Sequence, residues 1–347
     1  MGYKLNKTDI NNIFKDLSKE YLIYAPKLFE GEGTYSDTDK VRYGEIKTID
    51  DIAFDKKALY SYKEVLLPIS ETLFFFTEDT IKEADAPKKG AIIFLRSCDL
   101  HAVKRMDDIY LRNGQEDYYY KRIRENAKFI LMGCENSFEN CFCVSMGTNK
   151  NDDYDAYLKL NDDDAYLKLN DDDVYVDIKN DTLKNLFKTN EGIDVKPDFV
   201  INNNINVSIP ENLSLDIMKS EMWKDYSSRC IACGRCNFVC PTCTCFTMQD
   251  IFYTDNGKAG ERRRVWASCH VDGFTNMAGG HSFRLDKGQR MRFKVLHKVY
   301  DYKKKWGYQM CVGCGRCDDV CPEYISFSNC VNKLKDGMKE VSTNDKK

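Results

Sequence analysis

Long apolar runs are missing from this sequence of 347 residues. Its strongest runs, residues 73–76 and 91–95, fall far short of the 18 or so apolar residues that a membrane-spanning helix needs. Residues 1–12 lack the apolar core of a secretory signal. The net charge is only -3, so nothing global indicates a nucleic-acid-binding protein. We therefore expect a cytoplasmic protein that binds neither membranes nor nucleic acid.

Cysteine is absent before Cys98, although the chain contains 16 cysteines. In a reducing compartment, such clustering is better explained by metal or redox chemistry than by disulfides. The length favours two domains over one. We expect an α/β domain over residues 1–213 and a cysteine-rich domain over residues 214–347.

Hydrophobic periodicity in the first part of the chain predicts alternating helices and strands. Residues 5–21 have the pattern of a capped helix, and residues 71–76, 91–98 and 127–134 are typical of strands. The amphipathic segment 100–113 separates two of these strands. A strand, a helix of about three turns and a second strand form a βαβ unit, which predicts an α/β fold with parallel pairing.

An exact tandem repeat, AYLKLNDDD, occupies residues 156–173. Two copies are too few for a solenoid, which needs about three or more. We interpret residues 151–173 as an acidic surface loop or hairpin that carries no chemistry. A calcium site is the alternative, but the segment lacks the Gly and Glu of an EF-hand loop.

The pattern Cys-x2-Cys-x2-Cys-x3-Cys-Pro occurs twice, as CIACGRCNFVCP from residue 230 and as CVGCGRCDDVCP from residue 311. Three closely spaced thiolates can hold one corner of a 4Fe-4S cluster, and in two-cluster ferredoxins the fourth cysteine ligates the other cluster. Zinc sites use paired Cys-x2-Cys units without the third cysteine. The motifs therefore predict two 4Fe-4S clusters. Their ligands are Cys230, Cys233, Cys236 and Cys321 in one cluster, and Cys311, Cys314, Cys317 and Cys240 in the other.

The segment between the two motifs is too long for a compact ferredoxin. Residues 246–253 and 287–306 have helical patterns, so we expect an α-helical ferredoxin-like domain. Residues 284–305 contain nine basic residues and two aspartates. These basic residues can balance the cluster charge or dock an acidic partner, or they can simply form a solvated helix face.

Eight cysteines lie outside the two motifs. Cys98 and Cys134 each follow a predicted strand, and parallel strands would bring them to one edge of the sheet. Cys141 and Cys143 follow in the next loop, so these four could hold a third 4Fe-4S cluster or could be buried thiols. Near the motifs, the expected packing cysteines are Cys243, Cys245, Cys269 and Cys330, and a reactive Cys269–His270 pair is the weaker interpretation.

Several stretches outside the motifs carry a resemblance to a known family. They are RSCDLHAVKRMDDIYL at residues 96–111, GCENSFENCFCVSMG at 133–147 and RRVWASCHVDGFTNMAGGHSFR at 263–284. Together with both cysteine motifs, they resemble the iron–sulfur subunit of the anaerobic sulfite reductases, and the β subunits of cytoplasmic sulfhydrogenases share much of the pattern. The resemblance covers residues 85–330.

The resemblance implies an iron–sulfur subunit that relays electrons from an NADH-oxidising flavin subunit to a siroheme subunit, which reduces sulfite to sulfide. No catalytic residue is expected in this chain, and it contains no Gly-x-Gly-x-x-Gly for a dinucleotide. We expect no substrate turnover by the chain alone. Two alternatives stay open: the β subunit of a nickel–iron sulfhydrogenase, and an enzyme whose α/β domain binds a flavin or a small substrate.

Overall fold

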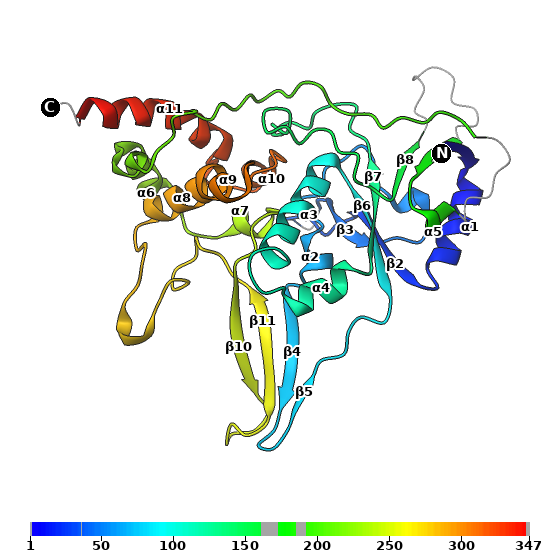
Figure 1. Cartoon of the computed structure of the whole chain (residues 1–347), viewed down its shortest axis with the longest axis horizontal. Coiled ribbons are helices and arrows are strands. Elements are labelled where there is room, and N and C mark those ends of the chain that lie inside the picture. The colour runs from blue at the N-terminus through cyan, green and yellow to red at the C-terminus, as the bar shows by residue number, and fades with distance from the viewer. Residues whose placement is uncertain (1, 36, 161–172, 185–191, 345–347) are drawn as a thin grey trace. The chain divides into compact units, whose positions relative to one another are not determined.

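The chain forms two compact units. The computed structural model describes residues 2–35, 37–160, 173–184 and 192–344. The first unit comprises residues 1–67, 85–138 and 148–202, and the second comprises residues 68–84, 139–147 and 203–347. The second unit thus takes residues 68–84, 139–147 and 203–213 from the part of the sequence that was expected to belong to the first domain. Figure 1 shows the elements of both units.

A mixed sheet with a parallel centre lies in the middle of the first unit. Among the described residues it has seven strands in the order β1-β9-β8-β7-β6-β2-β3. The central run β8-β7-β6-β2 is parallel, and β1, β9 and β3 pair antiparallel at the two sides. The strands are β1 (Gly2–Asn6), β2 (Tyr21–Phe29), β3 (Lys40–Glu45), β6 (Gly90–Leu95), β7 (Ala127–Met132), β8 (Ala156–Leu160) and β9 (Asp173–Ile178). The predicted α/β fold is therefore confirmed for this unit.

The helices of this unit are α1 (Lys7–Leu17), α2 (Lys63–Leu66), α3 (Ser97–Tyr110), α4 (Tyr118–Arg124) and α5 (Asp181–Lys184). The two helices that the sequence predicts in this unit, at residues 5–21 and 100–113, are present as α1 and α3, and both contact the sheet. The unit also contains short helices that were not predicted. Helix α1 begins where the Asn6 side chain accepts a 2.8 Å hydrogen bond from the Asp9 amide. Its apolar face joins Ile92 and Phe94 of β6 in one core. Because side chains alternate along a strand, Ile93 and Leu95 face the other way, and α3 contacts β6 and β7.

The duplicated nonapeptide lies only partly within the described residues. Ala156–Leu160 of the first copy form β8, and Asp173 at the end of the second copy begins antiparallel β9. Residues 161–172, and with them most of the predicted acidic loop, lie outside the description.

The second unit combines helices with an antiparallel sheet. Its helices are α6 (Lys224–Arg229), α7 (Arg235–Phe238), α8 (Lys287–Leu296), α9 (Tyr302–Trp306), α10 (Arg316–Asp319) and α11 (Phe327–Asn344), and a π-helical turn at His297–Asp301 joins α8 to α9. Among the described residues the sheet has four strands in the order β10-β11-β4-β5. These are β4 (Ser70–Phe76), β5 (Ile81–Glu83), β10 (Phe246–Phe252) and β11 (Gly260–Trp266). No helix in the described part of the chain has the length and apolar content needed to cross a bilayer.

Two expectations about these segments are wrong. Residues 246–253 were expected to be helical, but Phe246–Phe252 form β10, which pairs with β11 from Phe246↔Trp266 to Phe252↔Gly260. The predicted strand at residues 71–76 is present, but as β4 it pairs with β11 and lies in the second unit. In the first case hairpin pairing overrides a weak local pattern, and in the second case the partner strand is too far away in the sequence to be predicted.

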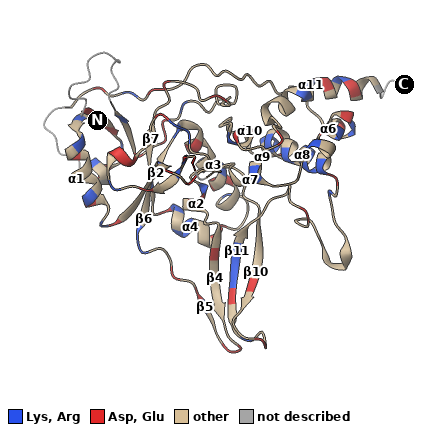
Figure 2. Ribbon diagram, turned by 180° about the vertical axis from the view of Figure 1, so that it is seen from behind, with Lys and Arg blue, Asp and Glu red and all other residues tan. Residues whose placement is uncertain are grey.

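A buried ion pair connects β4 and β11. Glu71 and Arg264 are direct cross-strand partners, and their side chains, 8% and 4% exposed, form a 2.9 Å ion pair. A second pair on the same sheet, Arg262 with Asp250, is 2.6 Å long, but its side chains are 45% and 34% exposed. Figure 2 shows the basic residues of β11 between acidic residues of β4 and β10.

We expect Arg264→Met to lower the free energy of unfolding by about 3–5 kcal/mol, because it leaves the buried Glu71 carboxylate without this partner. The matched control Arg262→Met breaks an exposed pair and should cost less than about 1 kcal/mol. Denaturant unfolding followed by far-UV circular dichroism measures both. Equal losses in the two variants would contradict the prediction.

Candidate iron–sulfur site

The two cysteine motifs adopt the same backbone conformation. In the first, Ala232 and Gly234 have left-handed φ values of 59° and 74°, and α7 follows at once. In the second, Gly313 and Gly315 have φ values of 65° and 71°, and α10 follows. The first two cysteines of each motif therefore lie on a tight loop and the third on a short helix.

A segment from the middle of the chain packs on the second motif. The Phe142 amide donates a 2.8 Å hydrogen bond to the Gly313 carbonyl, and the Cys141 thiol lies 3.5 Å from the Cys314 carbonyl oxygen. A Cβ atom added at Gly313 would lie 2.6 Å from the backbone of residues 142 and 143, and one at Gly315 would lie 2.2 Å from the Asn140 oxygen. Glycine is thus required at both positions by close approach as well as by φ.

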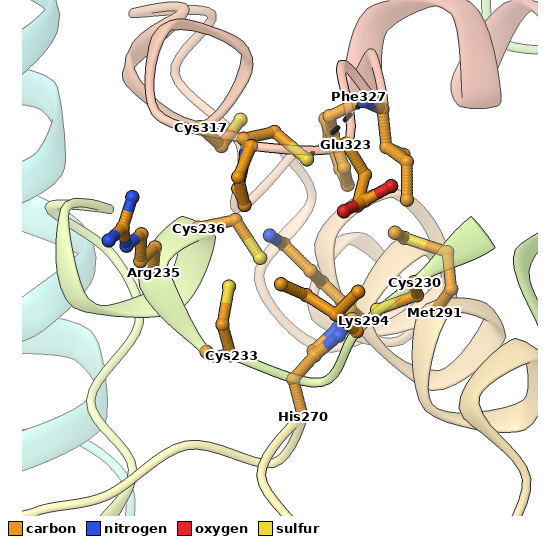
Figure 3. A pocket seen from close by; sticks show the side chains of 15 residues that line it. Cys230, Cys233, Arg235, Cys236, His270, Met291, Lys294, Cys317, Glu323 and Phe327 are labelled. Carbon is orange, nitrogen blue, oxygen red and sulfur yellow. Dashed lines mark hydrogen bonds between the residues drawn. The ribbon is translucent and has the colours of Figure 1, made fainter.

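Each of two cavities in the second unit is lined by cysteines of both motifs. The first cavity, shown in Figure 3, is lined by Cys230, Cys233, Cys236 and Cys321, and also by Cys317, which lines both cavities. The second is lined by Cys311, Cys314, Cys317 and Cys240. The structure thus brings the fourth cysteine of each motif to the cavity of the other.

Backbone amides point at the sulfurs of these cysteines. The Ala232 amide lies 3.4 Å from the Cys230 sulfur, and the corresponding Gly313 amide lies 3.5 Å from the Cys311 sulfur. The Ile325 amide lies 3.3 Å from the sulfur of Cys321. Such hydrogen bonds stabilise cysteine sulfur as a thiolate ligand and are among the features that set cluster potentials.

Two lysines of the basic segment are buried against the sulfurs. Lys294 and Lys298 are 4% and 2% exposed, and they lie one helical turn apart. Lys294 lines both cavities, whereas Lys298 lines only the second and donates a 2.5 Å hydrogen bond to the Thr242 hydroxyl. Burial alone would lower the pKa of Lys294, but the sulfurs of Cys236 and Cys317 hold it well above the ordinary value. Both ammonium groups therefore face anionic sulfur.

A histidine that the sequence analysis did not assign to the cluster site also lines the first cavity. His270 is 1% exposed, and among the described residues its Nε2 atom has no hydrogen-bond partner. Burial, followed by the charges of Lys294 and Arg290, lowers the pKa of His270 to about 3. The ring is therefore neutral at physiological pH, and Figure 3 shows it beside Cys233 and Lys294.

The four cysteines of the predicted third cluster divide between the two units. Cys98 lies in the first turn of α3 and Cys134 follows β7, so both lie just past the carboxyl ends of adjacent parallel strands in the first unit. Cys141 and Cys143 belong to the second unit, where both are buried. The Cys143 sulfur lies 3.7 Å from the Asn203 side-chain nitrogen.

A further cavity lies at the carboxyl edge of the sheet in the first unit, where α/β folds bind ligands. Arg96, Cys134 and Lys159 are among its lining residues. The Arg96 guanidinium donates to the carbonyls of Gly133 and Phe54, and Lys159 forms ion pairs with Glu135 at 2.6 Å and with Asp198 at 2.9 Å. These charged groups already have partners within the protein, and Cys98 does not line the cavity.

The residues of the two cavities fit 4Fe-4S clusters. Each cavity offers at least four cysteines, amides directed at sulfur, and at least one buried cation for the negative charge of a thiolate-ligated cluster. Among the described residues, no three His, Cys, Asp or Glu side chains converge closely enough to hold a single metal ion. Bound clusters would supply one-electron transfer, while the chain's own residues fix the ligands and balance their charge.

Comparisons with known proteins agree with this arrangement. Residues 229–325 match the family model described as a 4Fe-4S dicluster domain. The chain is 29% identical over 346 residues to sulfhydrogenase 2 subunit beta of Pyrococcus furiosus, and the match covers 96% of this chain and 98% of that protein. No solved structure matches the chain. The C-terminal region of this protein therefore contains a 4Fe-4S dicluster domain.

Proposed function

We propose that this chain is the iron–sulfur electron-transfer subunit of a multi-subunit oxidoreductase of the sulfhydrogenase type. The observation that carries the proposal is that each cavity is lined by three cysteines of one motif and the fourth of the other. We assign Cys230, Cys233, Cys236 and Cys321 to one cluster, and Cys311, Cys314, Cys317 and Cys240 to the other. Two clusters ligated in this crossed way form a two-step path for electrons.

The choice between a sulfhydrogenase and an anaerobic sulfite reductase rests on the Pyrococcus furiosus relative, which matches this chain over nearly its full length. The motifs led us to expect the iron–sulfur subunit of an anaerobic sulfite reductase, with a sulfhydrogenase β subunit as the alternative. The relative is named a β subunit of a sulfhydrogenase, so it favours the alternative. Such a name implies partner subunits, and we propose that one of them carries the hydrogen-oxidising centre.

Co-purification tests the choice of complex. The tagged chain, isolated from its own organism without oxygen, should bring nickel and catalyse the hydrogen-dependent reduction of a viologen dye. The chain produced alone should contain iron but should neither oxidise NADH nor reduce sulfite. Siroheme absorbance in the complex would favour the sulfite reductase instead. Turnover of NADH or sulfite by the isolated chain would overturn the proposed relay role.

The third cluster stays a prediction about Cys98, Cys134, Cys141 and Cys143. Two 4Fe-4S clusters contain eight iron atoms and three contain twelve. If these cysteines hold a cluster, the parent chain should bind about twelve iron atoms, and Cys98→Ala or Cys134→Ala should remove about four. Iron analysis of chain produced without oxygen measures this directly. A parent count near eight that neither variant changes would reject the third cluster.

A further inference from the structure

Two cysteines that line neither cavity meet at one end of a hairpin. Cys245 directly precedes β10, and Cys269 follows β11 by three residues. The Ala267 amide donates a 2.9 Å hydrogen bond to the Cys245 carbonyl and so extends the ladder between these strands. The hairpin therefore holds both cysteines at the same end, beside the residues of the first motif.

The two thiols form a hydrogen bond, and their surroundings differ. Both the thiol and the backbone amide of Cys269 hydrogen-bond to the Cys245 sulfur, which lowers the pKa of Cys245 although burial opposes the shift. The same thiol–thiol hydrogen bond, followed by burial, raises the pKa of Cys269. Cys245 is partly exposed, whereas Cys269 is only 7% exposed and its sulfur lies 3.2 Å from the Asn237 side-chain nitrogen.

This asymmetry is typical of redox-active thiol pairs. The attacking thiol of such a pair is accessible and has thiolate character, and the second thiol is buried behind it. Cys330 shows the contrasting environment of an inert thiol: it is 0% exposed, and burial raises its pKa to about 12.

We propose that Cys245 and Cys269 form a thiol–disulfide exchange centre whose substrate is a compound with a sulfur–sulfur bond, either an organic disulfide or a polysulfide. The proposal rests on the proposed electron-transfer function only for the electrons that restore the dithiol. The exchange itself needs nothing beyond the two cysteines and the substrate.

The exchange is balanced in atoms and electrons. The Cys245 thiolate attacks one sulfur of R–S–S–R′, the sulfur–sulfur bond breaks, and R′–S⁻ leaves and takes a proton from water. The Cys269 thiol gives its proton to water and attacks the Cys245 sulfur, and R–S⁻ leaves and is protonated. The pair is oxidised to a disulfide as R–S–S–R′ is reduced to two thiols. Restoring the dithiol takes two protons and two electrons, and reduced iron–sulfur clusters are the one-electron donors that would supply them.

Chemical trapping tests the proposal on the full chain with its iron content measured beforehand. The chain is treated without oxygen with glutathione disulfide in one arm and with sodium tetrasulfide in the other. Free thiols are then alkylated, and the protein is digested without reduction for mass spectrometry. We expect a cross-linked peptide that joins Cys245 to Cys269, with the loss of two alkylatable thiols per chain, in at least one arm. The arm that reacts identifies the substrate source.

Variants separate the roles of the two cysteines. Cys269→Ser should retain glutathione as a stable mixed disulfide on Cys245, because the second thiol is missing. Cys245→Ser should form neither adduct nor cross-link, and the control Cys330→Ser should form the cross-link as the parent does. Iron contents equal to that of the parent show that the variants have folded.

Three results would overturn the proposal. They are full alkylation of both cysteines in both arms, a cross-link from Cys245 to Cys243 in place of Cys269, and an adduct that forms on Cys269 first. A chain that forms the cross-link but binds no iron would disprove the relay function and leave the thiol pair standing. The two proposals can therefore fail separately.

Discussion

Cys240→Ala should lose about half of the iron in the dicluster domain, and the lost cluster should be the one whose other ligands are Cys311, Cys314 and Cys317. Cys240 lies in the first motif but lines the second cavity. Its removal leaves the three remaining cysteines without their fourth ligand. Iron and sulfide analysis of chain purified without oxygen gives the loss, and the reciprocal variant Cys321→Ala should lose the other cluster.

Combined variants show which cluster is lost without any need to assign spectra. If Cys240 and Cys314 ligate the same cluster, Cys240→Ala/Cys314→Ala should lose no more iron than either single variant. Each substitution alone already removes that cluster, so the two effects are not additive. Cys240→Ala/Cys233→Ala should lose the iron of both clusters. If Cys240→Ala/Cys314→Ala instead loses the iron of both clusters and Cys240→Ala/Cys233→Ala loses that of only one, each motif binds its own cluster and the crossed assignment is wrong.

Lys294→Met should lower the reduction potentials of both clusters. The Lys294 ammonium lines both cavities, and a buried positive charge stabilises the more negative, reduced state of a cluster. Two unit charges 4 Å apart interact by about 4 kcal/mol at an effective dielectric constant near 20, and less at longer range. Since about 1.4 kcal/mol corresponds to about 59 mV for one electron, we expect a shift on the order of 100 mV.

Lys298→Met is the matched control for this prediction. Lys298 is just as deeply buried on the same helical face but lines only the second cavity. Its removal should lower the reduction potential of the cluster in the second cavity and leave that of the cluster in the first cavity nearly unchanged. Redox titration followed by electron paramagnetic resonance measures both clusters in each variant. Unchanged potentials in Lys294→Met, or equal shifts of both in Lys298→Met, would contradict this account of the charge balance.

The cavity cysteines could be predicted from the sequence because their chemistry fixes their spacing. The eight motif cysteines line two cavities, and Cys98 and Cys134 follow adjacent parallel strands as their apolar runs indicated. The lysines were harder to place. The sequence offered nine basic residues between 284 and 305, and only packing distinguishes Lys294 and Lys298 from the solvated members of the segment.

The antiparallel sheet could not be predicted for a different reason. Strand β10 is exposed along its whole length, and its apolar residues do not keep one alternation, because Phe246 and Met248 are followed by the adjacent pair Ile251 and Phe252. Its neighbour β11 pairs on the other side with β4, which lies far away in the sequence. Local patterns carry no information about such a partner. His270 was missed as a cavity residue because a single histidine has no spacing from which to argue.

The assembly of the second unit from three separate segments bears on how the protein matures. Residues 203–347 contain the cysteine motifs, but β4 and β5 come from residues 68–84, and residues 139–147 pack on the second motif. During synthesis, these two earlier pieces leave the ribosome long before the motifs that they support. Cluster insertion should therefore follow release of nearly the whole chain, and residues 214–347 produced alone should fold poorly and bind little iron.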